Sequence, residues 1–203
     1  YKRQELNRAS PRTQSALLEA MSEGCVTVDH QTYQLPRPFM VFATQNPTQS
    51  IGTYELPESQ LDRFAAKLQM GYPSAKRELE ILQAAERDPL RGVRENVVDG
   101  STMLQLSKDL EAIHVSPSVA QYVKKIIDAS RTHPKIRLGI STRGGVQWLR
   151  MAKAMAMLQG RAFVIPDDLQ RLAVPCLAHR LQTLADGKPS DLIAALVQSV
   201  DVI

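Results

Sequence analysis

Gln4-Glu5-Leu6-Asn7-Arg8-Ala9-Ser10 is the stretch that decides the fold, together with Ala43-Thr44-Gln45-Asn46-Pro47, Leu61-Asp62-Arg63-Phe64 and Ser141-Thr142-Arg143 further along the chain. Each segment carries a carboxylate, a carboxamide or an arginine beside apolar residues. One such segment is a weak signal, because polar residues next to apolar ones occur on any protein surface. The order and spacing of all four in one chain are informative.

The bulk composition is that of an ordinary globular protein. The chain has 203 residues, of which 43% are hydrophobic and 23% are charged, enough to bury one good core or two small ones. No run approaches the roughly 18 consecutive apolar residues of a membrane span. Residues 1–4, Tyr-Lys-Arg-Gln, lack the apolar stretch of a signal peptide. We therefore expect a cytoplasmic protein.

Charge and cysteine usage favour neither a nucleic-acid partner nor a metal centre. The net charge is +4, but the 25 basic residues are interspersed with 21 acidic ones and form no block, which is typical of a solvated surface. Cys25 and Cys176 lie in apolar surroundings without C-x-x-C spacing, so we expect buried free thiols. The four histidines form no ligand motif, and we expect no protein metal site.

The first third of the chain predicts part of an α/β layer. Ser10-Pro11 is an N-cap followed by proline at the first helical position, which predicts a helix over residues 11–23. Residues 25–35 alternate about a polar turn, as in a hairpin. The apolar run 39–43 predicts a strand covered on both faces, with polar residues at its carboxyl end, where open α/β sheets bind ligands. After a short helical segment over 58–64, residues 67–70 predict another strand.

The rest of the chain predicts a helical domain. Gly71-Tyr72-Pro73-Ser74 marks the boundary, so we expect domains over residues 1–72 and 73–203. Helices are predicted over about 75–87, 103–112, 143–159 and 167–182. A further helix opens at Ser116-Pro117 and carries apolar residues at i, i+3, i+4, i+7 and i+8.

Glu5 and Asn46 are candidates for the chemistry of phosphate hydrolysis. A carboxylate such as Glu5 can orient the attacking water, and a carboxamide such as Asn46, at the end of an apolar run, can hydrogen-bond a terminal phosphate or that water. Alternatively, Glu5 is a solvated surface acid and Asn46-Pro47 is only a turn.

Arg63 and Arg143 are candidates for binding phosphate charge. Arg63 is suited to reach the nucleotide of an adjacent subunit, and Arg143, which opens a predicted helix, can contact a γ-phosphate bidentately. The alternatives are an ion pair of Arg63 with Asp62 or Glu58, and a plain helix-start role for Arg143.

Together these segments closely resemble MoxR-type AAA+ ATPases, and the resemblance runs over nearly the whole chain. It implies that Glu5 is the Walker B glutamate, Asn46 the sensor 1 asparagine, Arg63 the arginine finger and Arg143 the sensor 2 arginine. It also implies that residues 25–35 are the hairpin before sensor 1 and that the residues from about 75 onward form the lid. The expected fold class is α/β: a partial AAA+ P-loop NTPase αβα core, lacking the Walker A half, followed by an all-α lid domain.

The same resemblance implies an activity and its partners. In this family ATP and Mg²⁺ bind between the subunits of a ring, commonly a hexamer. The ring remodels or activates client proteins, often with a partner that carries a von Willebrand factor A domain. A magnesium-chelatase-like motor subunit is an alternative with the same architecture, and a catalytically inactive assembly module is another. A nucleic-acid motor is disfavoured because the chain has no basic stripe.

Three departures from the family pattern stand out. Gln4 replaces the Walker B aspartate, and His30 after Asp29 replaces the usual glycine of the hairpin turn. No G-x-x-x-x-G-K-[ST] loop occurs in the 203 residues. We therefore expect a C-terminal piece of a longer ATPase, which does not hydrolyse ATP on its own.

Overall fold

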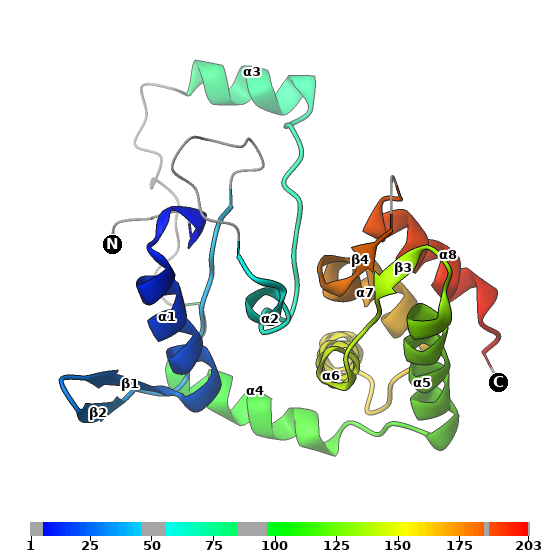
Figure 1. Cartoon of the computed structure of the whole chain (residues 1–203), viewed down its shortest axis with the longest axis horizontal. Coiled ribbons are helices and arrows are strands. Elements are labelled where there is room, and N and C mark those ends of the chain that lie inside the picture. Colours follow the sequence, from blue (N-terminus) through cyan, green and yellow to red (C-terminus); the bar gives the residue numbers. More distant parts are fainter. Residues whose placement is uncertain (1–5, 46–55, 85–96, 185–186, 203) are drawn as a thin grey trace.

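A computed structural model describes residues 6–45, 56–84, 97–184 and 187–202 (Figure 1). In chain order the elements are η1 (Leu6–Arg8), α1 (Pro11–Glu23), β1 (Cys25–Val28), β2 (Gln31–Gln34), α2 (Glu58–Leu61), α3 (Ala75–Gln83), α4 (Gly100–Ala112), α5 (Pro117–Thr132), β3 (Ile136–Leu138), α6 (Thr142–Leu158), α7 (Pro166–Leu177), η2 (Ala178–Arg180), β4 (Gln182–Thr183) and α8 (Pro189–Ser199). Figure 1 shows α1, α2 and the hairpin on one side and α5 to α8 on the other, with α4 running between them. Among the described residues, no helix is long and apolar enough to cross a bilayer.

Serine caps fix the starts of four of the described helices. The hydroxyl oxygens of Ser10, Ser74, Ser116 and Ser141 accept hydrogen bonds from backbone N–H groups three residues further on, at 3.3, 3.4, 3.2 and 2.9 Å. These bonds satisfy donors that a helix N-terminus leaves unpaired. The helices predicted from residue 11 and from Ser116-Pro117 are therefore confirmed, and the helix predicted over 143–159 is α6.

The predicted hairpin is also confirmed. β1 and β2 pair antiparallel, with Cys25 opposite Gln34 and Val28 opposite Gln31. The two turn residues both have positive φ, 48° at Asp29 and 64° at His30. A two-residue turn with positive φ at both positions matches the right-handed twist of the strands, and asparagine, aspartate and glycine favour it. His30 thus adopts the conformation that glycine would hold without strain.

Both other predicted strands are wrong. Residues 39–43 and 67–70 lie in described segments without strand structure, and Phe42 and Met70 are 90% and 95% exposed. A strand needs a neighbour that takes its backbone hydrogen bonds. Here Thr44 O accepts from Leu6 N at 3.2 Å, and Lys67 N donates to Pro175 O at 2.8 Å. Among the described residues, these bonds go to partners outside any strand and build no ladder.

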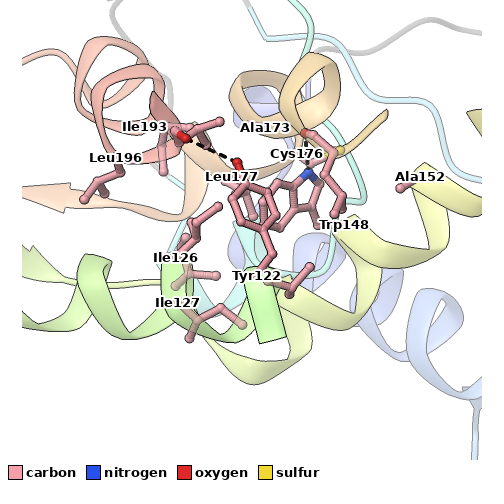
Figure 2. Packing of buried hydrophobic residues seen from close by; sticks show 14 of the residues in the cluster. Tyr122, Ile126, Ile127, Trp148, Ala152, Ala173, Cys176, Leu177, Ile193 and Leu196 are labelled. Carbon is pink, nitrogen blue, oxygen red and sulfur yellow. Dashed lines mark hydrogen bonds between the residues drawn. The ribbon is translucent and has the colours of Figure 1, made fainter. Parts of the chain in front are cut away.

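The largest core lies among α5, α6, α7 and α8 (Figure 2). Trp148 and Tyr122 are its largest fully buried side chains, and both have their polar atoms satisfied. Trp148 Nε1 donates to Leu169 O at 2.9 Å, and the Tyr122 hydroxyl donates to Val197 O at 3.2 Å. Each bond ties two helices together, because a buried aromatic polar group needs a partner.

Two details of the helical part differ from expectation. The helix predicted over 167–182 is α7, which ends at Leu177, and the turn η2 follows it. The pattern did not predict α8 or the small β3–β4 sheet.

α5 and α6 pack closely because residue 145 is glycine: a Cβ there would lie 2.4 Å from Ile127 Cδ1. The domain boundary at residue 72 stays a prediction.

Candidate functional site

The structure positions two of the four candidate residues. Arg63 follows α2, and Arg143 lies in the first turn of α6. Glu5 and Asn46 lie outside the described residues. The chemical roles of all four remain predictions.

Arg63 points back toward α1. Its Nη1 donates to Leu18 O at 3.4 Å, and its Nε is buried without a hydrogen-bond partner in the described part of the chain. An ion pair with Asp62 does not form, because the Asp62 carboxylate binds Arg180 instead. Among the described residues Arg63 has no ion pair with Glu58 either. Within the described residues, the arginine therefore keeps hydrogen-bonding capacity that is not used.

Asp62 links the segment after α2 to the C-terminal helices. Its Oδ1 accepts from Arg180 Nη1 at 2.9 Å, and Ser141 Oγ lies 3.1 and 3.2 Å from Oδ1 and Oδ2. Residues 62, 141 and 180 are far apart in sequence, and they meet where α2 lies between α1 and the C-terminal helices (Figure 1). A charge-assisted hydrogen bond of this kind is stronger than a neutral one.

Arg180 is the buried centre of this junction. Its side chain is 1% exposed. Besides Asp62, it donates from Nε to Cys176 O at 2.9 Å, from Nη2 to Phe64 O at 2.5 Å, and from Nη2 to Gln147 Oε1. Burial lowers the pKa of Arg180, the Asp62 carboxylate opposes that effect, and the positive charge of Arg143 adds to it. Since arginine titrates far above neutral pH, the guanidinium remains charged.

Phe64 O takes a second hydrogen bond from the neighbouring His179. The His179 Nε2 lies 3.1 Å from Phe64 O. Burial and the Arg180 charge lower the pKa of His179, so the neutral ring donates from Nε2 to this carbonyl. Two consecutive residues of η2 thus hold the same backbone atom.

Arg143 contrasts with Arg180. Its side chain is exposed, and among the described residues it has no hydrogen bond or ion pair. Gly144 follows it, and a Cβ there would lie 2.9 Å from Arg180 Nη1. The glycine lets the Arg180 guanidinium pass against the first turn of α6, so two positive charges lie close together. The Asp62 carboxylate already compensates the Arg180 charge, so the exposed Arg143 is the charge at this helix N-terminus that an anion can reach.

Sequence reasoning singled out Arg63 and Arg143 but missed Arg180, Ser141 and Gln147 as members of the same site. Arg180 lies three positions after the apolar end of α7, and its sequence context carries no signal for this role. Cys176, predicted to be buried, is 1% exposed, and burial raises the pKa of its thiol to about 11. Cys25 is only half-buried.

Comparison with known proteins identifies the family of the chain. Residues 3–66 match the ATPase family associated with various cellular activities, and residues 128–198 match the AAA lid domain. The chain is 32% identical to chaperone MoxR1 of Mycobacterium tuberculosis, over 95% of this chain and 53% of that protein. The chain belongs to the MoxR-type AAA+ ATPases. The AAA+ fold with a lid domain, expected from the sequence, is thereby confirmed.

Two further relatives support the MoxR-type assignment. The uncharacterized protein YeaC of Bacillus subtilis is 46% identical, over 91% of this chain and 58% of that protein. The crystal structure of a candidate ATPase from Cytophaga hutchinsonii superposes with a TM-score of 0.90 at 31% identity, over 98% of this chain and 64% of that one. A rice magnesium-chelatase subunit ChlI is more distant, at 25% identity over 88% of this chain and 43% of its own length. The chain thus spans little more than half the length of the curated MoxR-type relatives it matches.

Proposed function

We propose that this chain is the part of a MoxR-like ATPase that couples ATP hydrolysis to the remodelling or activation of client proteins. The observation that carries the proposal is the junction of Asp62 and Arg180, which joins the segment that carries Arg63 to the start of α6, where Arg143 lies. The names of the MoxR relatives support the chaperone-like role. A ring, most simply a hexamer, would place Arg63 against the nucleotide of the next subunit.

Each candidate residue has a distinct part in the proposed reaction. Glu5 orients the water that attacks the terminal phosphate, and Asn46 hydrogen-bonds that water or the phosphate. Arg143 binds the γ-phosphate of its own subunit, while Arg63 stabilises charge on the phosphate of the neighbour. Little covalent chemistry falls to the protein in phosphoryl transfer, so catalysis rests on placing these groups.

The described residues fit a polyphosphate ligand. Arg143 is exposed and has no hydrogen bond or ion pair among them, so its guanidinium is free to bind phosphate oxygens. Mg²⁺ would accompany ATP, because it binds through phosphate oxygens, water and one or two carboxylates rather than a full protein cage.

Two other functions compete with this proposal. A catalytically inactive assembly module is favoured by Gln4, since a carboxamide is a poorer Mg²⁺ partner than the family aspartate. A magnesium-chelatase-like motor is supported less, because those relatives share lower identity with the chain. We also propose a cytoplasmic location and a partner with a von Willebrand factor A domain, both from the resemblance to the family.

ATP binding and turnover with Mg²⁺ test the proposal, measured on the full-length gene product and its Glu5→Gln variant. We expect the parent protein to turn over ATP. The variant should bind ATP but lose turnover by about 10²- to 10⁴-fold, the range for loss of a positioned base. If the full-length parent protein neither binds nor hydrolyses ATP, the assembly module is the better description.

A further inference from the structure

The residues on either side of Arg63 are held by one buried side chain. Arg180 binds the carboxylate of Asp62 at 2.9 Å and the carbonyl oxygen of Phe64 at 2.5 Å. Arg63 therefore lies at the middle of a three-residue turn whose two neighbours share the same guanidinium. Ser141 also bonds the Asp62 carboxylate and His179 also bonds Phe64 O, but Arg180 is the one side chain that reaches both neighbours of Arg63 among the described residues, so a shift of Arg180 disturbs both sides of this turn at once.

Asp62 and Arg180 also bind residues on either side of Arg143. Ser141, two positions before it, donates to Asp62, and Gln147, one turn after it, accepts from Arg180. Gly144, directly after it, leaves the space through which Arg180 passes. Asp62 and Arg180 thus bracket both candidate arginines without contacting either through a hydrogen bond in the described part of the chain.

Through these contacts, the segments that carry Arg63 and Arg143 are joined by one hydrogen-bond network. Arg180 is 1% exposed and Asp62 26%, so water competes poorly for their hydrogen bonds. Breaking one contact of such a network leaves buried polar groups unsatisfied, which favours all-or-none rearrangement over gradual drift.

We propose that Asp62 and Arg180 are positioning residues that transmit nucleotide contact at Arg143 to the turn carrying Arg63. The inference rests on the proposed ATPase function and adds a route by which one subunit's nucleotide state sets the arginine offered to its neighbour. Asp62 and Arg180 touch no phosphate in this scheme. Their effect is on the rate of the chemical step rather than on ATP affinity.

The test uses the full-length gene product with Asp62→Asn and, separately, Arg180→Lys. Asp62→Asn keeps the side-chain shape and loses the charge, and Arg180→Lys keeps the charge and loses the fork that reaches several acceptors. We expect kcat to fall by about 10- to 100-fold in each, the effect of small misplacement of a catalytic group, with KM for ATP unchanged within about twofold. Asp167→Asn is the matched control, since Asp167 forms an exposed ion pair with Arg171 in the same helical part.

Hydrogen exchange distinguishes coupling between the Arg143 and Arg63 segments from a role of Asp62 and Arg180 in stability alone. In the parent protein, ATP should protect residues 60–66 and residues 141–147 together. In either variant we expect ATP still to protect 141–147 but no longer 60–66. If the variants instead lose protection equally in both segments, with and without ATP, Asp62 and Arg180 serve stability alone and the inference is overturned.

The remaining outcomes are also decisive. If one variant fails to fold, the other decides the result, because the two remove different features of the joint. A parent protein with normal ATP turnover and variants that match it in kcat and in ATP-induced protection would reject the coupling alone. A parent protein without ATP turnover would reject the proposed function, and the inference with it.

Discussion

At the scale of single residues, the most demanding feature is the charge of Arg180 inside the helical part. Removing a guanidinium from water costs several kcal/mol, which partners must offset. Arg180 meets this cost with a carboxylate, two backbone carbonyls and a carboxamide. Its partner Asp62 is therefore needed for stability as well as for geometry.

Asp62→Ala should lower the free energy of unfolding by about 3 kcal/mol, because it leaves Arg180 buried without its counter-charge. Chemical denaturation of the full-length gene product, followed by a probe of the helical part such as Trp148 fluorescence, measures this change. Asp167→Ala removes one partner of the exposed Arg171–Asp167 pair and should cost less than about 1 kcal/mol. Equal losses in the two variants would contradict the argument.

At the scale of elements, local signals explain most of what the sequence could predict. The caps at Ser10 and Ser116 act within one turn of helix, and both helices begin where those caps place them. The hairpin is equally local. The run 39–43 has strand composition, but strand pairing depends on a distant neighbour, and the described residues supply only the Leu6–Thr44 bond. Sequence periodicity carries no information about that partner.

The hairpin turn offers an element-scale prediction. A non-glycine residue in the left-handed region costs roughly 1–2 kcal/mol, and His30 has φ of 64°. His30→Gly should therefore stabilise the hairpin, because glycine relieves this strain. The net gain is at most about 1 kcal/mol, because the greater entropy of glycine in the unfolded chain offsets part of it. Slower hydrogen exchange at the Leu35 amide, which donates to Gly24 O at 2.8 Å, would report this. Gln31→Gly, in the adjoining strand, should instead speed exchange there.

The start of α7 depends on an acid that titrates. Asp168 accepts from Ile165 N at 3.0 Å and from Arg161 at 2.5 and 2.9 Å. Burial alone would raise the pKa of Asp168, but the Arg161 and Ile165 hydrogen bonds together outweigh burial and lower it. A lowered pKa in the folded state means that the stabilisation is complete above the unfolded value, about 3.9, and is lost as pH falls through the folded value.

Asp168→Asn should therefore destabilise the protein at neutral pH by about 2 kcal/mol, the scale of a charged buried hydrogen bond. The difference from the parent protein should shrink as the pH falls from about 5 toward 2 and Asp168 becomes protonated in the parent. Thermal melts over that pH range give the comparison. A constant difference at all pH values would show that Asp168 acts through packing rather than charge.

At the scale of the whole molecule, the candidate site lies between parts of the chain that fold from separate signals. Sequence patterns identified Arg63 in one part and Arg143 in the other, because each stands in a recognisable segment. They could not identify the Asp62–Arg180 pair, because 118 positions separate its members and neither residue is unusual in its own segment. Long-range ion pairs are set by tertiary packing, and only the fold brings them together.

Assembly provides the whole-molecule prediction. If Glu5 serves its own subunit and Arg63 serves the neighbour, the full-length variants Glu5→Gln and Arg63→Ala should each be nearly inactive. Arg63→Ala should lose about 10³-fold or more in turnover, as expected for a catalytic arginine. Mixing the two variants should restore part of the turnover, because some interfaces then combine an intact Glu5 with an intact Arg63. Mixed samples that stay as inactive as either variant alone would place both residues in the same subunit's site.

The burial of Cys176 also affects how the protein can be labelled with a thiol-reactive dye. The Cys176 thiol has a pKa of about 11 and is 1% exposed, so at neutral pH it is almost entirely protonated and shielded from solvent. A maleimide dye should therefore not react with it. Within these 203 residues, Cys25 is the other cysteine, and it is only half-buried at the first position of the hairpin. Cys25 thus offers an attachment point for a fluorophore at the start of the hairpin, without an engineered thiol.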